Sequence, residues 1–341
     1  MYLAHLKKNI MIRFFKVAFI FAMSLMIFSC HKNEDPTPEY VVPFAEQYPR
    51  DIAAIDKYLD EYHMDVAVLD GSYDVTFKKI SIMPTPGVSI RNQTDYPLLN
   101  KTVNRNGVNY KVYYISLREG TKERPTKVDS AFVSYKGYLL NETVFDQAQN
   151  PVWFTLDRVI QGWRDIMPLF KSGTFATDAD GTVNYTNFGA GVMFLPSGLA
   201  YYNGSRGAIP SYSPLIFTFK LKGVNYVDHD YDRIDSKDED VDGDGDPTND
   251  DSDADGHPNY LDIDDDGDGY STKSEIKKPT PLSAGQGTSL YYPFSPIVDD
   301  PTTTINESEP KGIPSLSGDG DTPTRLRRHL DKNAKPPYIT Y

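Results

Sequence analysis

The spacing of apolar residues in the first third of the chain predicts one helix followed by short strands. Over residues 45–63 the apolar side chains recur every three or four positions, the period of an amphipathic helix with one buried face. The residues of this buried stripe are Ile52, Ile55, Leu59 and Tyr62. Residues 73–83 and 108–117 alternate as half-buried strands do, and Asn106-Gly107 before the second run is typical of a hairpin turn. We therefore expect residues 45–124 to form a small accessory α+β region.

The middle of the chain alternates in the same way but contains only one short helical segment. A polar stretch at residues 118–127 separates it from the accessory region, and residues 128–140 then alternate like a half-buried strand. Further strand-like runs lie at residues 152–156, 191–196 and 215–224. The helical segment, residues 162–170, should be stopped or bent at Pro168. Several strands and one short helix predict an α+β fold in which a helix covers one face of an antiparallel sheet.

Five short motifs in this part of the chain follow one another in a fixed order. They are Tyr135-Lys136-Gly137, Phe145-Asp146, Val159-Ile160-Gln161-Gly162-Trp163, Ala200-Tyr201 and Leu215-Ile216-Phe217. Together they resemble the FKBP-type peptidyl-prolyl isomerases, and five motifs in order are far more specific than any one alone. The resemblance implies an FKBP-like antiparallel sheet wrapped on one short helix, and we place that domain at residues 125–227.

The resemblance also implies a pocket for a prolyl ring. Trp163 would be its floor, with Gly162 allowing close approach, and the Ile160 amide would bind a substrate carbonyl, with Asp146 and Tyr201 as further polar contacts. The catalytic residues implied by the family are Tyr135, Phe145, Asp146, Val159, Ile160, Trp163, Tyr201, Ile209 and Phe217. The chemistry agrees, because a prolyl ring is apolar and lacks an N–H, so an aromatic-walled slot suits it. Rotation about the X-Pro amide breaks no bond between heavy atoms, so neither a nucleophile nor a cofactor is expected for catalysis.

Departures from the family pattern lie around the rim of this pocket. Val152 stands where an aromatic residue is usual, with Trp153 displaced by one position, and Tyr202 stands where a glycine is usual. Residues 176–191 extend a loop between helix and strand. Two more aromatic residues are expected in the core rather than in the pocket, Phe154 and Phe219. Two interpretations therefore stay open, a working isomerase and a catalytically weak FKBP-like binding or chaperone module.

The charge of the chain is concentrated in one segment. The whole chain has a formal net charge of −13, yet residues 228–275 contain twenty acidic and three basic residues, a net −17. The rest of the chain is therefore slightly basic, at +4. Such a concentration of carboxylates speaks against nucleic acid as a partner and for cations.

The acidic segment repeats with a period of eleven residues between residues 240 and 269. Asp-x-Asp-x-Asp-Gly directs alternate carboxylates at one centre while glycine permits a sharp turn, an arrangement that suits the oxygen-binding cation Ca²⁺. The expected ligands are Asp240, Asp242, Asp244, Asp251, Asp253, Asp255, Asp262, Asp264 and Asp266. Shifted by two positions, the last copy also fits a complete EF-hand loop, with Asp264, Asp266, Asp268, the Tyr270 carbonyl, Thr272 and Glu275 as ligands.

The surroundings of these loops are not those of an EF-hand. Pro258 and the dense aspartates exclude a normal incoming helix, and the array is more similar to thrombospondin type 3 repeats, whose calcium-bound stretches have little regular secondary structure. The alternative is a disordered acidic linker, but the regular glycine phasing favours calcium. We assign residues 228–277 to a structural, calcium-binding repeat region.

The N-terminus is typical of a targeting signal. Basic residues precede the apolar run 17–28, which is too short to span a bilayer comfortably, and Ser29 and the only cysteine, Cys30, follow it. This pattern resembles a bacterial lipoprotein signal, in which residues 1–29 are removed and Cys30 receives the lipid. Residues 30–44 would then be a flexible tether. The alternative is an unmodified thiol at a cleavage site, and a single cysteine allows no intramolecular disulfide.

The last residues, 278–341, are rich in Pro, Gly, Ser and Thr and predict a solvated tail with a basic patch at residues 325–330. The alternatives are that this patch packs against the acidic array or meets an anionic surface. Taken together, the sequence predicts a lipoprotein of the outer membrane of a Gram-negative bacterium that isomerises X-Pro bonds in exported polypeptides. The alternatives are a binding module of a surface complex and a protein whose acidic array mediates calcium-dependent adhesion.

Overall fold

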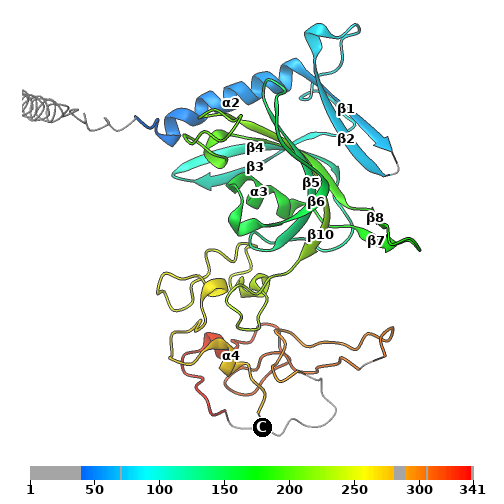
Figure 1. Cartoon of the computed structure of the whole chain (residues 1–341). Coiled ribbons are helices and arrows are strands. Elements are labelled where there is room, and N and C mark those ends of the chain that lie inside the picture. The colour runs from blue at the N-terminus through cyan, green and yellow to red at the C-terminus, as the bar shows by residue number, and fades with distance from the viewer. Residues whose placement is uncertain (1–39, 70, 280–288, 305, 339–341) are drawn as a thin grey trace, which may run out of the picture. The chain divides into compact units, whose positions relative to one another are not determined.

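The computed structural model describes residues 40–69, 71–279, 289–304 and 306–338 (Figure 1). The expected signal segment and Cys30 lie outside the described residues. The chain divides into two compact units, Met1–Val42 and Pro43–Tyr341, and the second unit contains every helix and strand of the described residues. Within the described ranges, no helix is long and apolar enough to cross a bilayer.

The second unit begins with the expected helix. Helix α2 (Phe44–Glu61) leads directly into a hairpin of two antiparallel strands, β1 (Tyr62–Leu69) and β2 (Ser72–Lys79). Ile55 and Leu59 of the predicted stripe are fully buried, whereas Ile52 is only partly buried, and Tyr58 also belongs to the buried face. The hydrophobic period thus indicated the helix and most of its buried side correctly.

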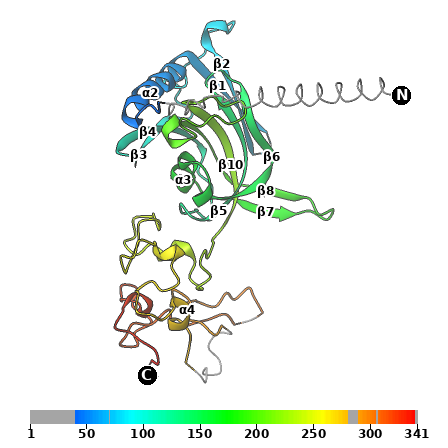
Figure 2. The same cartoon turned by 60° about the vertical axis from the view of Figure 1, so that its left-hand side comes forward.

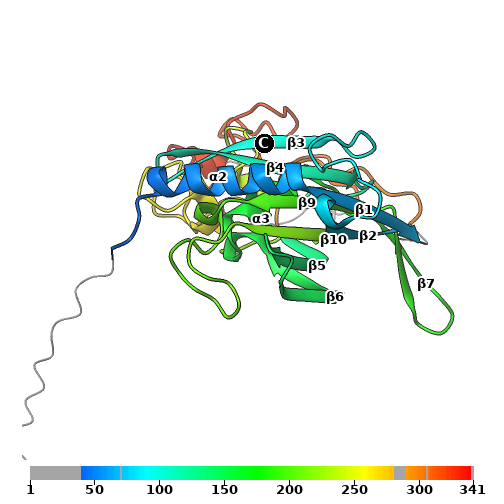
Figure 3. The ribbon, with the colours of Figure 1, turned by 90° about the horizontal axis from the view of Figure 1, so that it is seen from above.

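A six-stranded antiparallel sheet forms the centre of this unit. In spatial order its strands are β3 (Leu98–Arg105), β4 (Val108–Arg118), β9 (Gly189–Leu195), β10 (Leu215–Asn225), β5 (Ser130–Leu139) and β6 (Val144–Thr155). Seen from above, the strands follow in that order, with α2 running beside β4 and β9 (Figure 3). Asn106 and Gly107, with φ of 50° and 71°, form the expected hairpin turn between β3 and β4.

The accessory region is continuous with the FKBP-like region, in contrast to what we expected. Strand β4 pairs with β9, for example Ile115 opposite Val192, so the boundary expected at residue 124 falls inside one sheet. The polar residues that suggested a boundary form the loop that leads from β4 to β5. Pairing over more than seventy residues of sequence leaves no local signal, and for this reason the alternation of β4 alone did not reveal its partner.

Both faces of the sheet are covered, which explains why every residue of β9 is buried. Met193 and Leu195 of β9 belong to the core under the inner face, and Val192 and Phe194 belong to a second core under α2 and the β1–β2 hairpin. Because side chains alternate along a strand, a strand covered on both sides reads as a continuous apolar run. Helix α2 and the β1–β2 hairpin therefore cover the outer face.

The short helix lies against the concave inner face (Figure 2). Helix α3 (Gln161–Ile166) continues as one 3₁₀ turn, η3 (Met167–Leu169), where Pro168 ends the α-helical hydrogen bonding as predicted. Trp163, Ile166 and Met167 are buried against the sheet. The insertion after α3 forms a hairpin of two short strands, β7 (Thr174–Thr177) and β8 (Val183–Thr186).

The acidic array has little regular secondary structure, as its repeat pattern indicated. It contains two 3₁₀ turns, η5 (Ser236–Glu239) and η6 (Asn259–Leu261), and one helical turn, α4 (Thr272–Glu275). The phased glycines Gly245, Gly256 and Gly267 all have left-handed backbones, with φ of 86°, 98° and 65°. This conformation is the reason the repeat needs glycine at this position.

The residues after the array are not a solvated tail. Arg328 and His329 in the turn η7 (Arg328–Leu330) are only 4% and 2% exposed, and Arg328 Nη2 donates to the Lys277 carbonyl. Ile313 is fully buried in a small core with Ile234 and Ile276. The expectation of a solvated basic patch is therefore wrong: the C-terminal segment packs on the end of the array.

Candidate active site and candidate cation sites

The candidate active site is a cavity of about 580 Å³ bounded by β5, β6, α3 and the loop after β9. Its lining consists of Tyr135, Phe145, Asp146, Phe154, Arg158, Val159, Ile160, Trp163, Ala200, Tyr201, Gly204, Arg206 and Phe217. Eight of the nine expected catalytic residues are among them. The exception is Ile209, which is buried in the inner core and does not line the cavity.

Trp163 forms the floor of this cavity and is only 3% exposed. The rings of Phe217 and Tyr135 stand edge-on to it, with centroids 5.3 and 5.6 Å away. Phe154 does the same at 5.7 Å, so our expectation that Phe154 is a core residue was wrong. Phe219 is buried in the core as expected. Edge-to-face contacts of this kind hold four rings in fixed orientations.

The two motif glycines are required by close packing. A Cβ on Gly137 would lie 2.5 Å from the Phe145 ring, so glycine there allows Phe145 to form a cavity wall. A Cβ on Gly162 would lie 2.4 Å from Leu195 of β9. Gly162 therefore lets α3 approach the sheet, so the close approach expected at this glycine is made by the protein itself.

Three polar groups face the aromatic walls. The Tyr135 hydroxyl donates a hydrogen bond of 2.6 Å to Asp146 Oδ2, and burial together with this acceptor raises the pKa of Tyr135, so the phenol stays neutral. The Ile160 carbonyl accepts from the Trp163 amide, but the Ile160 amide itself has no hydrogen-bond partner among the described residues. Tyr201 completes the set, with the Arg206 guanidinium 5.1 Å from its ring centroid. An unused amide at an apolar wall can receive a carbonyl oxygen.

The departures on β6 have a simple geometric explanation. Successive side chains of a strand point to opposite faces, so Val152 and Phe154 share one side while Trp153 points to the other. Trp153 stacks on Phe132, with centroids 4.8 Å apart, and is 52% exposed. The aromatic wall on this strand is therefore supplied by Phe154, and Trp153 does not line the cavity.

Tyr202, at the position where a glycine is usual in the family, has a backbone conformation that favours glycine. Its φ is 53°, in the left-handed region, and its carbonyl accepts a 2.6 Å hydrogen bond from the Tyr212 amide. Its ring stacks on Phe44 at the start of α2, with centroids 4.0 Å apart. The stacking offsets the cost of a left-handed tyrosine, so the loop next to Tyr201 keeps its path.

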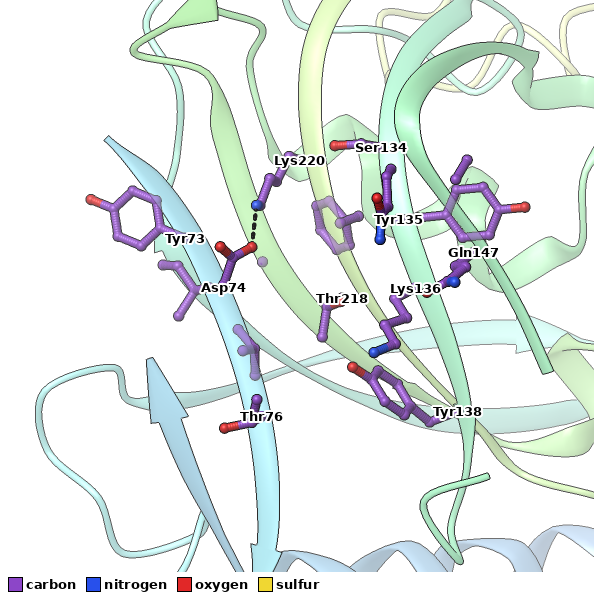
Figure 4. Close-up of a pocket in the computed structure, with 16 residues that line it drawn as sticks. Tyr73, Asp74, Thr76, Ser134, Tyr135, Lys136, Tyr138, Gln147, Thr218 and Lys220 are labelled. Carbon is purple, nitrogen blue, oxygen red and sulfur yellow. Dashed lines mark hydrogen bonds and ion pairs between the residues drawn. The ribbon is translucent and has the colours of Figure 1, made fainter. Parts of the chain in front are cut away.

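A second cavity, of about 480 Å³, lies on the outer face between β2 and strands β5 and β10 (Figure 4). Lys220 and Asp74 form an ion pair of 2.6 Å at its edge, which ties β2 to the sheet. Tyr135 alone of the expected site residues borders it, and the Tyr135 hydroxyl is engaged by Asp146. This cavity belongs to the contact between the hairpin and the sheet.

The acidic array brings carboxylates together in three loops, with ligand atoms within 4.8 Å of one another in each. The three clusters are Asp240, Asp242 and Asp250; Asp251, Asp253 and Asp255; and Asp264, Asp266 and Asp268. Among the described residues, Asp244 and Asp262 join no cluster, and each accepts a hydrogen bond from an amide two residues later. Asp250 was missed, because it lies at the junction of two repeats rather than at a motif position.

The EF-hand part of the prediction adds Tyr270, Thr272 and Glu275 to the cluster around Asp264. Thr272 Oγ1 accepts a hydrogen bond from the Asp265 amide, and Tyr270 is 41% exposed. Glu275 is fully buried; Tyr338 donates to its Oε1 while its Oε2 has no partner among the described residues, and burial raises its pKa to about 8.

The loop oxygens fit a hard cation. One carboxylate oxygen each of Asp264 and Asp266 is buried without a hydrogen-bond partner in the described part of the chain, as are Asp250 Oδ2 and Asp251 Oδ1. Asp268 Oδ2 also lacks a hydrogen bond, but it forms an ion pair with Lys335 Nζ at 3.7 Å. Buried charged oxygens without partners are costly unless a cation neutralises them. All of these ligands are oxygens, the donor set that Ca²⁺ prefers.

A fourth cluster was not expected from the sequence. It consists of Asp230, Asp232, Glu239 and Asp265, with ligand atoms within 4.8 Å of one another. Burial raises the pKa of Asp232 to about 8, of Asp265 to about 9 and of Glu239 to about 11, and repulsion between the carboxylates adds to the effect.

Comparison with protein families gives two matches. Residues 121–222 match the family described as FKBP-type peptidyl-prolyl cis-trans isomerase, and residues 229–305 match the family described as BamM C-terminal. The first match covers the strands and the helix that build the candidate active site and supports an FKBP-type domain there. The second covers most of the acidic array and part of the segment after it.

Curated relatives cover the same part of the chain. A probable FKBP-type peptidyl-prolyl cis-trans isomerase FkpA of Neisseria meningitidis is 34% identical over 34% of this chain and 37% of its own length. The peptidyl-prolyl cis-trans isomerase Mip of Coxiella burnetii is 32% identical over 35% and 45%, and an outer membrane protein MIP of Legionella longbeachae is 31% identical over 35% and 44%. The chain thus spans less than half the length of these relatives.

Solved structures include FkpA of Escherichia coli, at 26% identity and a TM-score of 0.31, over 40% of this chain and 54% of that one. A peptidyl-prolyl cis-trans isomerase of Pseudomonas syringae pv. tomato has 24% identity and a TM-score of 0.30, over 40% and 84%.

Proposed function

We propose that this protein is a peptidyl-prolyl cis-trans isomerase, with its active site in the cavity floored by Trp163. The observation that carries the proposal is the floor itself: an indole that is only 3% exposed yet lines an open cavity, held edge-on by the rings of Tyr135, Phe154 and Phe217. The FKBP-type family match over residues 121–222 supports it.

The proposed chemistry needs only binding and positioning. Rotation about an X-Pro amide has a barrier of about 20 kcal/mol from lost resonance. The aromatic walls would hold the prolyl ring, the free Ile160 amide would donate to a substrate carbonyl, and the Tyr201 hydroxyl would donate to another. An apolar surrounding favours the twisted amide, whose carbonyl is less polar than that of the planar form. Asp146, oriented by Tyr135, would be a further polar contact for the substrate.

The test is a prolyl-isomerase assay on a soluble form that starts at His31, with a short X-Pro peptide and calcium present. Acceleration of isomerisation supports the proposal. A folded, calcium-loaded sample without acceleration would instead leave an FKBP-like binding module, the alternative that the altered rim at Val152 first suggested.

We propose further that the protein works in the cell envelope, anchored through lipid on Cys30, where exported polypeptides with X-Pro bonds are its substrates. The support comes from the signal-like N-terminus and from one relative that is named an outer membrane protein. Replacement of Cys30 by serine should release the protein from the membrane fraction of cells. Retention of the Cys30→Ser variant in that fraction would contradict lipid anchoring.

We also propose that the three aspartate loops bind Ca²⁺ and that this binding makes the array rigid. The support comes from the converging carboxylates of each loop and their unpartnered buried oxygens. Isomerisation would not depend directly on the ion.

A further inference from the structure

The fourth carboxylate cluster differs from the three loops in how it is built. Each loop takes its ligands from one short stretch of chain, whereas this cluster joins Asp265 of the last repeat to Asp230, Asp232 and Glu239, which precede the first repeat. It is also the most buried: Asp232, Glu239 and Asp265 are 2%, 3% and 1% exposed.

The carboxylate oxygens of this cluster are largely unused. Both oxygens of Glu239 and both oxygens of Asp265 are buried without a hydrogen-bond partner among the described residues. Asp232 accepts from the Ile234 amide through Oδ1, and Asp230 accepts from the Asp232 amide through Oδ1, but Oδ2 of each is unpartnered in the same part of the chain. Each of these two aspartates therefore shapes its own turn with one oxygen and presents the other to the cluster.

Among the described residues, no cationic side chain forms an ion pair with this cluster. Lys237 pairs with Asp235 and Asp238, and Lys273, whose charge acts on Asp232 from a distance, donates to the Tyr231 carbonyl. His229, the nearest imidazole in sequence, meets the Ser236 hydroxyl through Nδ1 at 2.9 Å. Four carboxylates at this separation, most of them cut off from water, repel one another strongly unless a cation sits between them.

We propose that Asp230, Asp232, Glu239 and Asp265 bind a divalent cation, a fourth site outside the three loops, and that the ion is Ca²⁺. Two of its ligands, Asp230 and Asp232, belong to a turn in which the Arg233 amide donates to Asp228, as the glycine amides do to the first aspartate of each of the three loops. Ca²⁺ is favoured because the donor set contains only oxygens and the ligands come from irregular backbone that can adapt to a large coordination number. The fourth site extends the proposed calcium binding by the three loops, and its failure can be told apart from theirs by counting the bound ions.

This fourth ion would link the start of the array to its end. The segment that it fixes also carries His229, which lies 3.8 Å from Asp157 and edge-on to the ring of Tyr260 at 5.3 Å. Asp157 belongs to η2 (Leu156–Arg158), which precedes the cavity wall at Val159 and Ile160. Filling the site would therefore fix the array on the segment next to the candidate active site.

The test is calcium titration of the full chain in detergent by calorimetry, after removal of bound metal with a chelator. We expect four ions in the unaltered protein. Glu239→Gln, which keeps the shape and removes the charge, should weaken one of the four sites by at least about tenfold and leave the other three unchanged. The matched control is Asp255→Asn in the exposed second loop, which should lose a loop ion and keep the ion at the fourth site.

The outcomes separate the two proposals. Three ions in the unaltered protein, with no change in Glu239→Gln, would overturn the fourth site and leave the loops intact, whereas no bound calcium at all would overturn both. If Glu239→Gln does not fold, crystals of the unaltered protein soaked with Mn²⁺ provide the second measurement. Anomalous density among the four carboxylates supports the site, and its absence while the loops are occupied contradicts it.

Discussion

Asp51 in α2 and Ser197 in the loop after β9 are joined by two hydrogen bonds across 146 residues of sequence. Both the amide and the hydroxyl of Ser197 donate to Asp51 Oδ2, at 2.7 and 2.6 Å, and both residues are almost fully buried. The loop that starts at Ser197 leads to Tyr201 of the candidate active site. The helix on the outer part of the fold therefore positions a residue of the cavity.

The first prediction concerns this link. Asp51→Ala should lower the free energy of unfolding by about 1–3 kcal/mol, because it leaves the buried Ser197 amide and the Gln47 side chain without their acceptor. Urea denaturation of the isolated variant measures the loss. Ser197→Ala keeps the hydrogen bond from its backbone amide to Asp51, so it should lower the free energy of unfolding by less. An equal or larger loss in Ser197→Ala would contradict this account.

The burial of Asp51 should also make the stability of the protein depend on pH. Burial raises its pKa above the usual value, so the folded protein binds a proton more readily than the unfolded chain does. The stability that this group contributes is full at pH values below its unfolded pKa and is lost as the pH rises through its folded pKa. Asp51→Asn cannot titrate, so the stability of the unaltered protein relative to this variant should fall as the pH rises above about 4. A difference that is constant with pH would argue against a raised pKa.

The second prediction uses the left-handed backbone of Tyr202. Tyr202→Ala should be less stable than Tyr202→Gly by about 1 kcal/mol, because both lose the ring stacked on Phe44 but only alanine is strained at a φ of 53°. Thermal unfolding of the two variants gives the comparison. If alanine proves the more stable of the two, the backbone at this position does not have the conformation described.

The third prediction concerns Tyr135 and Asp146. Tyr135→Phe keeps the ring against Trp163 and removes the 2.6 Å hydrogen bond that orients the carboxylate. We expect kcat/KM for an X-Pro peptide to fall about tenfold, in line with the loss of one hydrogen bond to a charged group. Unchanged kcat/KM would show that the orientation of Asp146 does not matter.

The fourth prediction concerns substrate preference. Arg158 and Arg206 both line the cavity, and Arg158 is 80% exposed, so positive charge borders the opening. Peptides with an acidic residue next to the X-Pro bond should be isomerised faster than their lysine counterparts, and salt should reduce the difference. Arg206→Glu should reverse the preference; the same preference in the variant would exclude a role for this rim.

The fifth prediction concerns calcium removal. With chelator, the array should lose its compact form because its net charge of −17 is no longer neutralised, while the sheet remains folded on its own two cores. Calorimetry should then show a low-temperature transition that calcium abolishes. One transition unaffected by chelator would contradict calcium binding by the array.

The candidate active site was predictable because its signal is local. Each of its main side chains belongs to a short sequence motif, as Tyr135, Phe145 and Trp163 do. The structure brings these side chains to one cavity. Ile209 was misplaced for the opposite reason, since nothing in its neighbourhood tells whether a buried side chain faces a cavity or the core.

Long-range relationships were not predictable. The pairing of β4 with β9 and the link from Asp51 to Ser197 join segments that no local period connects. The same holds for Asp265, which lies between motif positions and whose side chain turns away from its own loop to meet residues more than twenty positions earlier. A repeat pattern predicts only ligands that occupy the same position in every copy, whereas Asp265 joins a cluster that occurs once.

The most direct test of the central claim is isomerisation of an X-Pro peptide by two tryptophan variants of the soluble, calcium-loaded protein. Trp163→Ala removes the buried floor of the cavity, and Trp153→Ala removes an exposed ring on the other face of β6. We predict acceleration by the unaltered protein and by Trp153→Ala, and its loss in Trp163→Ala. Equal activity of the two variants, or a folded protein that accelerates nothing, would contradict an active site floored by Trp163.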